Sequence, residues 1–249
     1  MVARPPVRIS VEMMKVDDLA EVQVIERESF TTPWPPHAYR QELETNRLAH
    51  YIVARSGDVI VGFAGIWLLV DEAHVTTFAT RRSWRRQGIG ERLLLALLDL
   101  ARNRGAHAAT LEVRPSNIAA RRLYEKYGFM VVGIRPRYYS DDNEDALIMT
   151  TDPLDGPAMH DRLARLRAEV SRRPDIELGY DGLPLDLRPG VEPAEGGSAA
   201  GSAAGSAGLG SEAAGSGGAG SGGAGSEDPE GRRATAPDVL RPSNVRKSR

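Results

Sequence analysis

Hydrophobic and polar positions alternate along the first 151 residues in short blocks that predict strands, with helical patterns between them. The predicted strands span residues 7–13, 48–55, 59–70, 72–80, 107–113, 129–135 and 144–151. Most of these blocks are rich in β-branched or aromatic residues, and Gly, Pro, Asn or Asp lie near their ends. Gly57-Asp58, between the second and third blocks, is typical of a tight hairpin.

Apolar residues recur at helical spacing in the segments between these strands. One helix is predicted from an N-cap at Asp17 through Ser29. Further helices are predicted at 37–45, at 89–104 before Gly105, and from Asn117 to the residue before Gly128. The order of elements indicates an α/β (α+β) domain, in which helices flank a mixed, mostly antiparallel sheet.

The pattern changes after Asp152, so we expect the domain to span residues 1–152. Residues 153–193 read as an extension, with a candidate short helix at 159–173 followed by proline-rich coil at 174–193. Residues 194–249 begin with a long run of almost only Ala, Gly and Ser, which cannot bury enough apolar surface to order the chain. We expect this low-complexity tail to be disordered and dispensable.

Composition narrows the function classes. The 249 residues have a net charge of −2 and no cysteine. Without a basic excess, nonspecific binding of nucleic acid is not favoured, and without cysteine an acyl-cysteine intermediate is excluded. The histidines show no metal-ligand spacing, and there is no signal peptide or membrane-spanning apolar run. We therefore expect a cytoplasmic protein without a metal and without a membrane partner.

A basic, glycine-containing turn follows the predicted strand 72–80 and leads into a helix. Gly88 and Gly90 let backbone N–H groups approach a phosphate, and a helix N-terminus adds partial positive charge. The turn has neither a third spaced glycine nor the Gly-Lys-Ser/Thr of a Walker loop. It resembles the pyrophosphate loop of the GCN5-related N-acetyltransferases, which bind acetyl-CoA. That resemblance implies the following loop residues as acetyl-CoA ligands: Arg85, Arg86, Gln87, Gly88, Ile89, Gly90 and Glu91.

Two further stretches, Leu111-Glu112-Val113-Arg114 and Leu123-Tyr124 through Gly128-Phe129, are similar to the same family. They resemble in particular its ribosomal-protein-alanine N-acetyltransferase branch. Smaller matches are Pro33-Trp34, Asp71-Glu72-Ala73, Tyr138-Tyr139 and Glu144-Asp145-Ala146. The resemblance covers about residues 7–151 and implies an acetyl-CoA-dependent acyltransferase. It also implies that Glu112, Asn117 and Tyr124 are its functional residues.

The chemistry of an N-terminal amine suits these residues. Its pKa is about 7.7–8.0, against about 10.4 for a lysine amine, so it is substantially neutral near neutral pH. Glu112, at the carboxyl end of its strand, can accept the amine proton directly or through a water. Tyr124 can donate a proton to the leaving thiolate. By resemblance, Asn117, about two helical turns before Tyr124, holds the cofactor or a nearby water.

The strand end and two loops complete the predicted site. Backbone N–H groups of Phe78, Ala79 and Thr80 are expected to bind the pantetheine arm and to polarise the acetyl carbonyl. Trp34 on one side and Tyr138 with Tyr139 on the other could form a narrow mouth for a protein N-terminus. The chain departs from the family at 80–84, where Thr-Arg-Arg-Ser-Trp replaces Val-x-Pro-x-Tyr/Trp.

Structural alternatives exist for these residues. Glu112 could pair with Arg114 at the strand edge, Arg81 and Arg82 could be solvated, and the aromatic residues could simply pack in the core. The predicted function is acetylation of a protein N-terminus, by resemblance that of a ribosomal protein beginning with Ala. Two alternatives stay open: acetylation of a small amine or lysine side chain, and a non-catalytic acetyl-CoA-binding module. A monomer is compatible with the sequence, which does not decide the oligomeric state.

Overall fold

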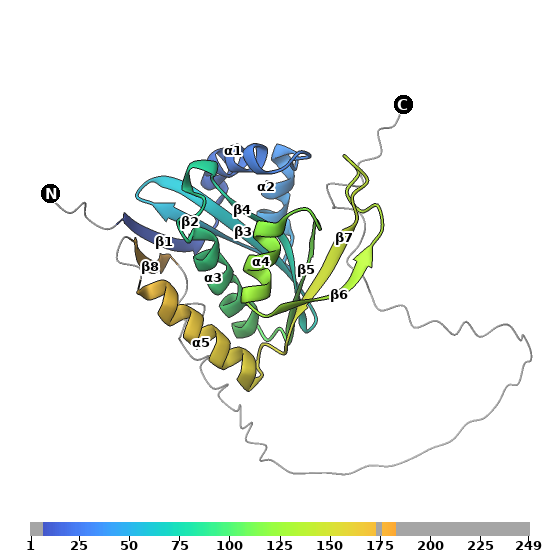
Figure 1. Cartoon of the computed structure of the whole chain (residues 1–249). Coiled ribbons are helices and arrows are strands. Elements are labelled where there is room, and N and C mark those ends of the chain that lie inside the picture. The colour runs from blue at the N-terminus through green and yellow to red at the C-terminus, as the bar shows by residue number, and fades with distance from the viewer. Residues whose placement is uncertain (1–6, 173–175, 183–249) are drawn as a thin grey trace, which may run out of the picture. The chain divides into compact units, whose positions relative to one another are not determined.

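The computed structural model describes residues 7–172 and 176–182, which form one sheet with helices on both faces (Figure 1). The strands are β1 (Val7–Met13), β2 (Ala49–Ser56), β3 (Val59–Leu69), β4 (Glu72–Thr80), β5 (Ala108–Val113), β6 (Phe129–Arg135), β7 (Ala146–Thr151) and β8 (Ile176–Gly182). The helices are α1 (Leu19–Ser29), α2 (Pro36–Thr45), α3 (Ile89–Asn103), α4 (Ile118–Lys126) and α5 (Pro157–Ser171). None of the helices in these ranges has the length and apolar character needed to cross a membrane.

The strand order in the sheet is β6-β7-β5-β4-β3-β2-β1-β8. Antiparallel pairs join β1, β2, β3 and β4 in succession, and β7 runs antiparallel to both β5 and β6. Two pairs are parallel, β4 with β5 and β1 with β8. This arrangement confirms the predicted mixed, mostly antiparallel sheet.

Alternating side chains of the central strands supply two separate cores. Ile52 and Ala54 of β2 belong to the core that α3 covers, while Tyr51 and Val53 belong to the core under α1 and α2. This alternation follows from the two-residue period of a strand. Both faces of β2 and β3 are buried, so their sequences read as nearly continuous apolar runs.

The sequence predictions need correction at both ends of the domain. Asp17 is not an N-cap, because a short 3-10 turn at Val16–Asp18 precedes α1, and the Asp18 carboxylate accepts the backbone N–H of Lys15 at 2.8 Å. The coil prediction at 174–193 is wrong for β8, which pairs in parallel with β1. Short proline-punctuated segments lack a strand signal of their own, and here the edge of β1 supplies the pairing. The predicted tail at 194–249 lies outside the described residues.

The candidate helix after residue 152 is present as α5, with buried Met159, Leu163, Leu166 and Val170 facing α3. It also packs on the turn after α4, where a side chain added at Gly128 would collide with Arg162 and Met159. The stripe predicted from sequence is thus the face that is buried in the larger of the two cores.

Candidate active site

The parallel strands β4 and β5 separate after a short contact. Their paired residues are Glu72 with Ala108, Ala73 with Ala109 and His74 with Thr110. Beyond His74, β4 continues for six residues whose edge toward β5 has no ladder partner. At the carboxyl ends of parallel strands such an opening is the usual place for a ligand in an α/β fold.

Backbone amides of β4 point into this opening. The N–H of Arg81 donates to the carbonyl of Val61 on β3 at 2.9 Å. Because hydrogen bonding alternates along an antiparallel ladder, the N–H groups of Thr80 and Phe78 face the opposite edge, toward β5. Two of the three predicted backbone donors, the N–H groups of Phe78 and Thr80, therefore face the opening. The N–H group of the third, Ala79, faces β3.

Glu112 lies on β5 beside the point where the strands separate. Its side chain is only 6% exposed, and its two carboxylate oxygens are bound from different strands. His74 Nε2 lies 2.9 Å from Oε2, and Arg135 of β6 lies 3.2 Å from Oε1. The alternative in which Glu112 pairs with Arg114 is therefore wrong.

Tyr124 approaches the opening from α4. Its ring packs edge-on against Phe78 with centroids 6.1 Å apart, and against Phe129 at 5.6 Å. Burial in these apolar surroundings raises the pKa of the Tyr124 phenol, so the hydroxyl stays protonated at neutral pH. Within the described part of the chain no residue hydrogen-bonds to that hydroxyl, which leaves it available as a donor.

The loop between β4 and α3 holds its shape through its own side chains. Gly88 precedes α3 in the left-handed region with φ 81°, a conformation that strains any residue with a Cβ. Arg85 donates to the carbonyl of Thr80 at 3.2 Å and to Ser29 at 3.3 Å, and Gln87 donates to the carbonyl of Ser83 at 3.1 Å. The first amides of α3, beginning at Ile89, have no acceptor in a preceding helical turn. This is a backbone arrangement suited to an anion.

Other predicted ligands near this loop serve structural contacts. The Glu91 carboxylate pairs with Lys126 of α4 at 2.7 Å. Asn117 is exposed and caps α4, because its side-chain oxygen accepts the N–H of Ala120 at 3.2 Å. A Cβ at Gly90 would lie 3.4 Å from Leu123 and 3.6 Å from Phe78, which are ordinary van der Waals distances. Arg86 is exposed, with φ 66°.

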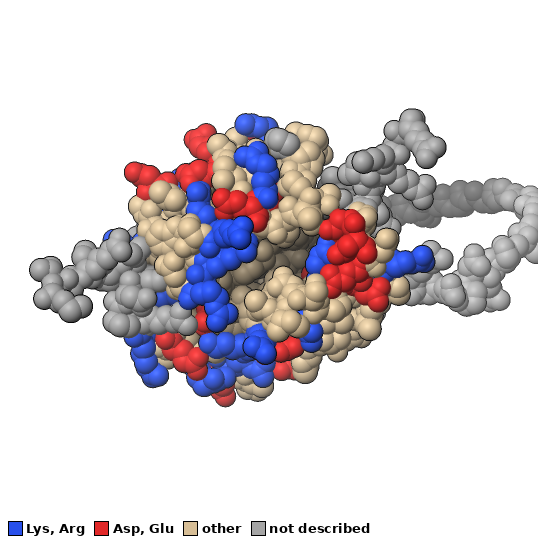
Figure 2. All heavy atoms as spheres, turned by 45° about the horizontal axis from the view of Figure 1, so that its top comes forward, with Lys and Arg blue, Asp and Glu red and all other residues tan. Residues whose placement is uncertain are grey.

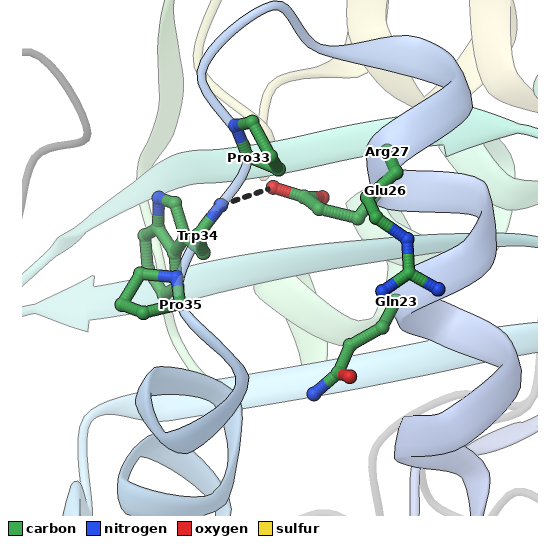
Figure 3. Close-up of a pocket in the computed structure, with 6 residues that line it drawn as sticks. All are labelled: Gln23, Glu26, Arg27, Pro33, Trp34 and Pro35. Atoms are coloured by element: carbon green, nitrogen blue, oxygen red, sulfur yellow. Dashed lines mark hydrogen bonds between the residues drawn. The ribbon is translucent and has the colours of Figure 1, made fainter.

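The α1–α2 loop carries Trp34, whose ring is largely buried and packs against Tyr39 with centroids 5.1 Å apart. The carboxylate of Glu26 in α1 accepts the backbone N–H of Trp34 at 3.0 Å and the hydroxyl of Tyr39 at 2.8 Å. Burial raises the pKa of Glu26, and these two hydrogen bonds oppose the shift. Figure 3 shows the pocket of about 210 Å³ between α1 and this loop, lined by Gln23, Glu26, Arg27, Pro33, Trp34 and Pro35.

The β6–β7 loop forms the other side of the predicted mouth. Arg114, just after β5, pairs with Asp141 at 2.6 Å and lies 3.8 Å above the ring of Tyr139. It also pairs with Asp142 and Glu144 of the same loop. Tyr138 packs edge-on against Tyr139 with centroids 5.1 Å apart. Burial raises the pKa of Tyr139, and the nearby Tyr138 phenol and Glu112 carboxylate add to the rise, against Arg114.

One hydrogen bond joins the two loops. Thr31 of the α1–α2 loop donates to the Asp141 carboxylate at 2.6 Å. The hydrogen bonds from Thr31 and Arg114 lower the pKa of Asp141 from 3.8 to about 2. Figure 2 shows a hollow on this side of the molecule, with Lys and Arg on one side of it and Asp and Glu on the other.

Sequence reasoning missed the partners of the site residues. His74 follows the matched Asp71-Glu72-Ala73 near the start of β4, the strand that pairs with the strand of Glu112, and this position was a usable signal. Arg135 could not be found this way, because β6 reaches Glu112 only across β7. Among the described residues no cluster of three or more potential ligands could hold a metal ion.

The opening between β4 and β5 thus has the glycine-containing loop before α3 at one end, and Glu112 and Tyr124 lie beside it. The family model described as "Acetyltransferase (GNAT) family" matches residues 19–129. The chain belongs to the GNAT acetyltransferases and is an acyltransferase.

Individual relatives show which members of the family the chain resembles. The chain is 33% identical over 142 residues to the [ribosomal protein bS18]-alanine N-acetyltransferase of Escherichia coli, covering 56% of this chain and 95% of that protein. It is 44% identical over 124 residues to the N-alpha-acetyltransferase RimI of Mycobacterium tuberculosis, covering 48% and 76% of the two chains. The crystal structure of the Escherichia coli ribosomal-protein-S18-alanine N-acetyltransferase aligns with a TM-score of 0.55 and 31% identity, covering 59% and 95%.

Proposed function

We propose that the protein transfers the acetyl group of acetyl-CoA to the N-terminal α-amino group of a protein, and that the acceptor is ribosomal protein bS18 with an N-terminal alanine. The observation that carries the proposal is the position of Glu112. Its carboxylate is held by His74 and Arg135 at the point where β4 and β5 separate. The names of the relatives support the choice of acceptor, and a ribosomal acceptor implies that the reaction takes place in the cytoplasm.

The residues present fit acetyl-CoA, whose thioester supplies the acetyl group when bound. The left-handed Gly88 and the amides of Ile89 and Gly90 at the start of α3 would hold the pyrophosphate, with Arg85, Arg86 and Gln87 around it. The amides of Phe78 and Thr80 that face the opening would bind the pantetheine arm and polarise the acetyl carbonyl. Glu91 and Asn117, with their contacts to Lys126 and Ala120, would act by shaping the loop and α4.

Glu112 would serve as the base. An N-terminal amine with a pKa of about 7.7–8.0 needs only a modest proton acceptor near neutral pH. His74 and Arg135 bind different oxygens of the carboxylate and so orient it. A water between the carboxylate and the amine would extend its reach without moving the side chain.

Tyr124 would serve as the acid. Its pKa is raised by burial, so the phenol keeps its proton until a stronger base appears close by. A leaving thiolate is such a base when it forms beside the hydroxyl. Burial of the ring between Phe78 and Phe129 fixes the direction of the hydroxyl and costs little side-chain freedom at the moment of transfer.

The two loops would form the acceptor entrance. The hydrogen bond between Thr31 and Asp141 joins them, and Tyr138 and Tyr139 lie in the loop that follows β6. An extended chain end is narrow enough to pass such an entrance, which favours an N-terminus over a folded surface. Trp34 would contribute as a buried support of its loop.

The test compares matched peptides with acetyl-CoA as donor. A peptide with the first residues of bS18 and a free N-terminal alanine should be acetylated at its α-amino group, with the site located by mass spectrometry. The same peptide with a blocked N-terminus and an internal lysine should not react. Turnover on the blocked peptide would favour a lysine or small-amine acetyltransferase, and CoA binding without transfer to any acceptor would favour a non-catalytic module.

A further inference from the structure

A fully buried arginine lies in the first turn of α3. Arg92 is 0% exposed and faces α5. Its guanidinium donates to the carbonyl of Gly88 at 3.1 Å and to the carbonyl of Val170 at 3.4 Å. Burying a guanidinium is costly unless its donors are used, so these two hydrogen bonds offset part of the cost of its burial.

The contact with Gly88 determines where the next amide points. The Gly88 carbonyl accepts both the guanidinium and the backbone N–H of Arg92, the latter at 3.3 Å. In a planar trans peptide the carbonyl and the following N–H point in opposite directions. Holding the Gly88 carbonyl toward Arg92 therefore directs the N–H of Ile89 away from the helix and out of the loop.

The contact with Val170 ties this arrangement to the last turn of α5. Helix C-terminal carbonyls carry partial negative charge and suit a guanidinium. Lys126, at the end of α4, adds a second tie, because it pairs with Glu91 of α3 at 2.7 Å and with Glu169 of α5 at 3.3 Å. The end of α5 is thus joined to the start of α3 at two points, although the family match ends at residue 129.

We propose that Arg92 is a positioning residue for the acetyl-CoA pyrophosphate and that α5 acts as a brace for the phosphate loop. Arg92 is buried and does not touch the ligand. It acts by fixing the peptide between Gly88 and Ile89 in the orientation that presents the amide. This inference rests on the proposed function, in which that loop binds the pyrophosphate.

The test is Arg92→Met, which keeps the apolar length of the side chain and removes its donors. Calorimetry with coenzyme A should show a dissociation constant raised about tenfold or more, the loss expected when charge-assisted hydrogen bonds no longer hold the loop. Pantetheine, which lacks the pyrophosphate, should bind as it does to the wild type in an NMR titration. A purely structural defect would weaken both ligands.

Matched variants separate the outcomes. Arg165→Met changes an exposed arginine of α5 that pairs with Glu169 of the same helix, and should leave coenzyme A affinity within about twofold. Arg92→Lys, which keeps a cation able to reach one carbonyl, should recover part of the affinity and serves as the main variant if Arg92→Met does not fold. Unchanged affinity in folded Arg92 variants, or an equal loss in Arg165→Met, would overturn the proposal.

Gly88→Val separates a failure of the role of Arg92 from a failure of the proposed phosphate site. A β-branched residue cannot adopt φ 81° without strain, so the loop itself should lose coenzyme A. If Gly88→Val loses affinity while Arg92→Met does not, only the role of Arg92 fails. If a folded Gly88→Val binds coenzyme A as the wild type does, the proposed phosphate site fails as well.

Discussion

Glu112 and Tyr124 reach the same opening from different elements, and their surroundings differ in kind. The carboxylate lies between two nitrogen donors, His74 and Arg135, whereas the phenol is enclosed by aromatic rings. Polar partners orient a group that must accept a proton, and apolar burial keeps a phenol protonated until a base forms next to it. The proposed division of roles between acid and base therefore rests on the difference between these two environments.

Glu112→Gln keeps the shape of the side chain and removes its capacity to accept a proton. We expect kcat with a peptide acceptor to fall about 100-fold or more, while the dissociation constant of coenzyme A stays nearly unchanged. Glu125→Gln, an exposed glutamate on α4, is the control and should keep wild-type turnover. Wild-type kcat in Glu112→Gln would remove this residue from the mechanism.

Tyr124→Phe removes only the phenol oxygen. We expect a loss of kcat of about 100-fold with little change in thermal stability, because the ring contacts with Phe78 and Phe129 remain. Tyr127→Phe, at the buried tyrosine directly after the same helix, should leave kcat close to that of the wild type. A normal rate in Tyr124→Phe would mean that a water or a backbone group supplies the proton.

Asp141 links the two loops, and its depressed pKa predicts a pH dependence. A carboxylate stabilised in the folded state contributes stability above its ordinary pKa of 3.8, and this contribution is lost as pH falls through about 2. The melting temperature of Asp141→Asn should therefore lie below that of the wild type at pH 6, with the difference shrinking between pH 4 and pH 2. Asp142→Asn, which has no contact with Thr31, is the control. A difference that persists at pH 2 would contradict the assignment.

At the scale of elements, α5 adds a buried face to the domain. Leu166 is fully buried against the core that α3 covers, so Leu166→Ala should lower the free energy of unfolding by about 2–5 kcal/mol. Arg165→Ala, on the exposed side of the same helix, should change it by less than about 0.5 kcal/mol. Urea unfolding of both variants measures the difference. Equal stabilities would show that α5 is dispensable and that the domain ends near residue 152.

The strand β8 extends the sheet past β1 and is the last described element. Its parallel pairing includes Ile9 with Leu178, and the side chain of Ile9 is fully buried. The chain must cross one face of the sheet between β7 and β8 before β8 can pair in parallel with β1. The helix α5 lies in this connection. Helix and strand thus form one continuation of the fold.

At the scale of the whole molecule, the last described element, β8, ends at Gly182. The composition of the Ala/Gly/Ser-rich part of the tail predicts that it does not pack against the domain. A chain ending after Gly182 should therefore match the full chain in melting temperature, coenzyme A affinity and peptide acetylation. A chain ending at Asp155 should melt at least several degrees lower, because it loses α5 and β8. Loss of activity in the longer truncation would assign a function to the tail.

The sequence by itself determined the fold class and the order of the strands and helices as far as α5, and it supplied the candidate residues for the chemistry. These follow from local signals: two-residue alternation for strands, helical stripes, and the turn at Gly88. Glu112 and Tyr124 could be named because they lie within contiguous motifs. Local patterns report which face of an element is apolar, and this is enough to predict the layers.

Only the tertiary structure decided which side chains surround those residues. His74, Arg135 and Glu112 come from three strands, and Thr31 meets Asp141 across 110 positions of the chain. The strand β8 exists through the free edge of β1, which no local pattern reports. Such contacts depend on strand order and register. These are set by packing of the whole chain, and a one-dimensional pattern holds no information about them.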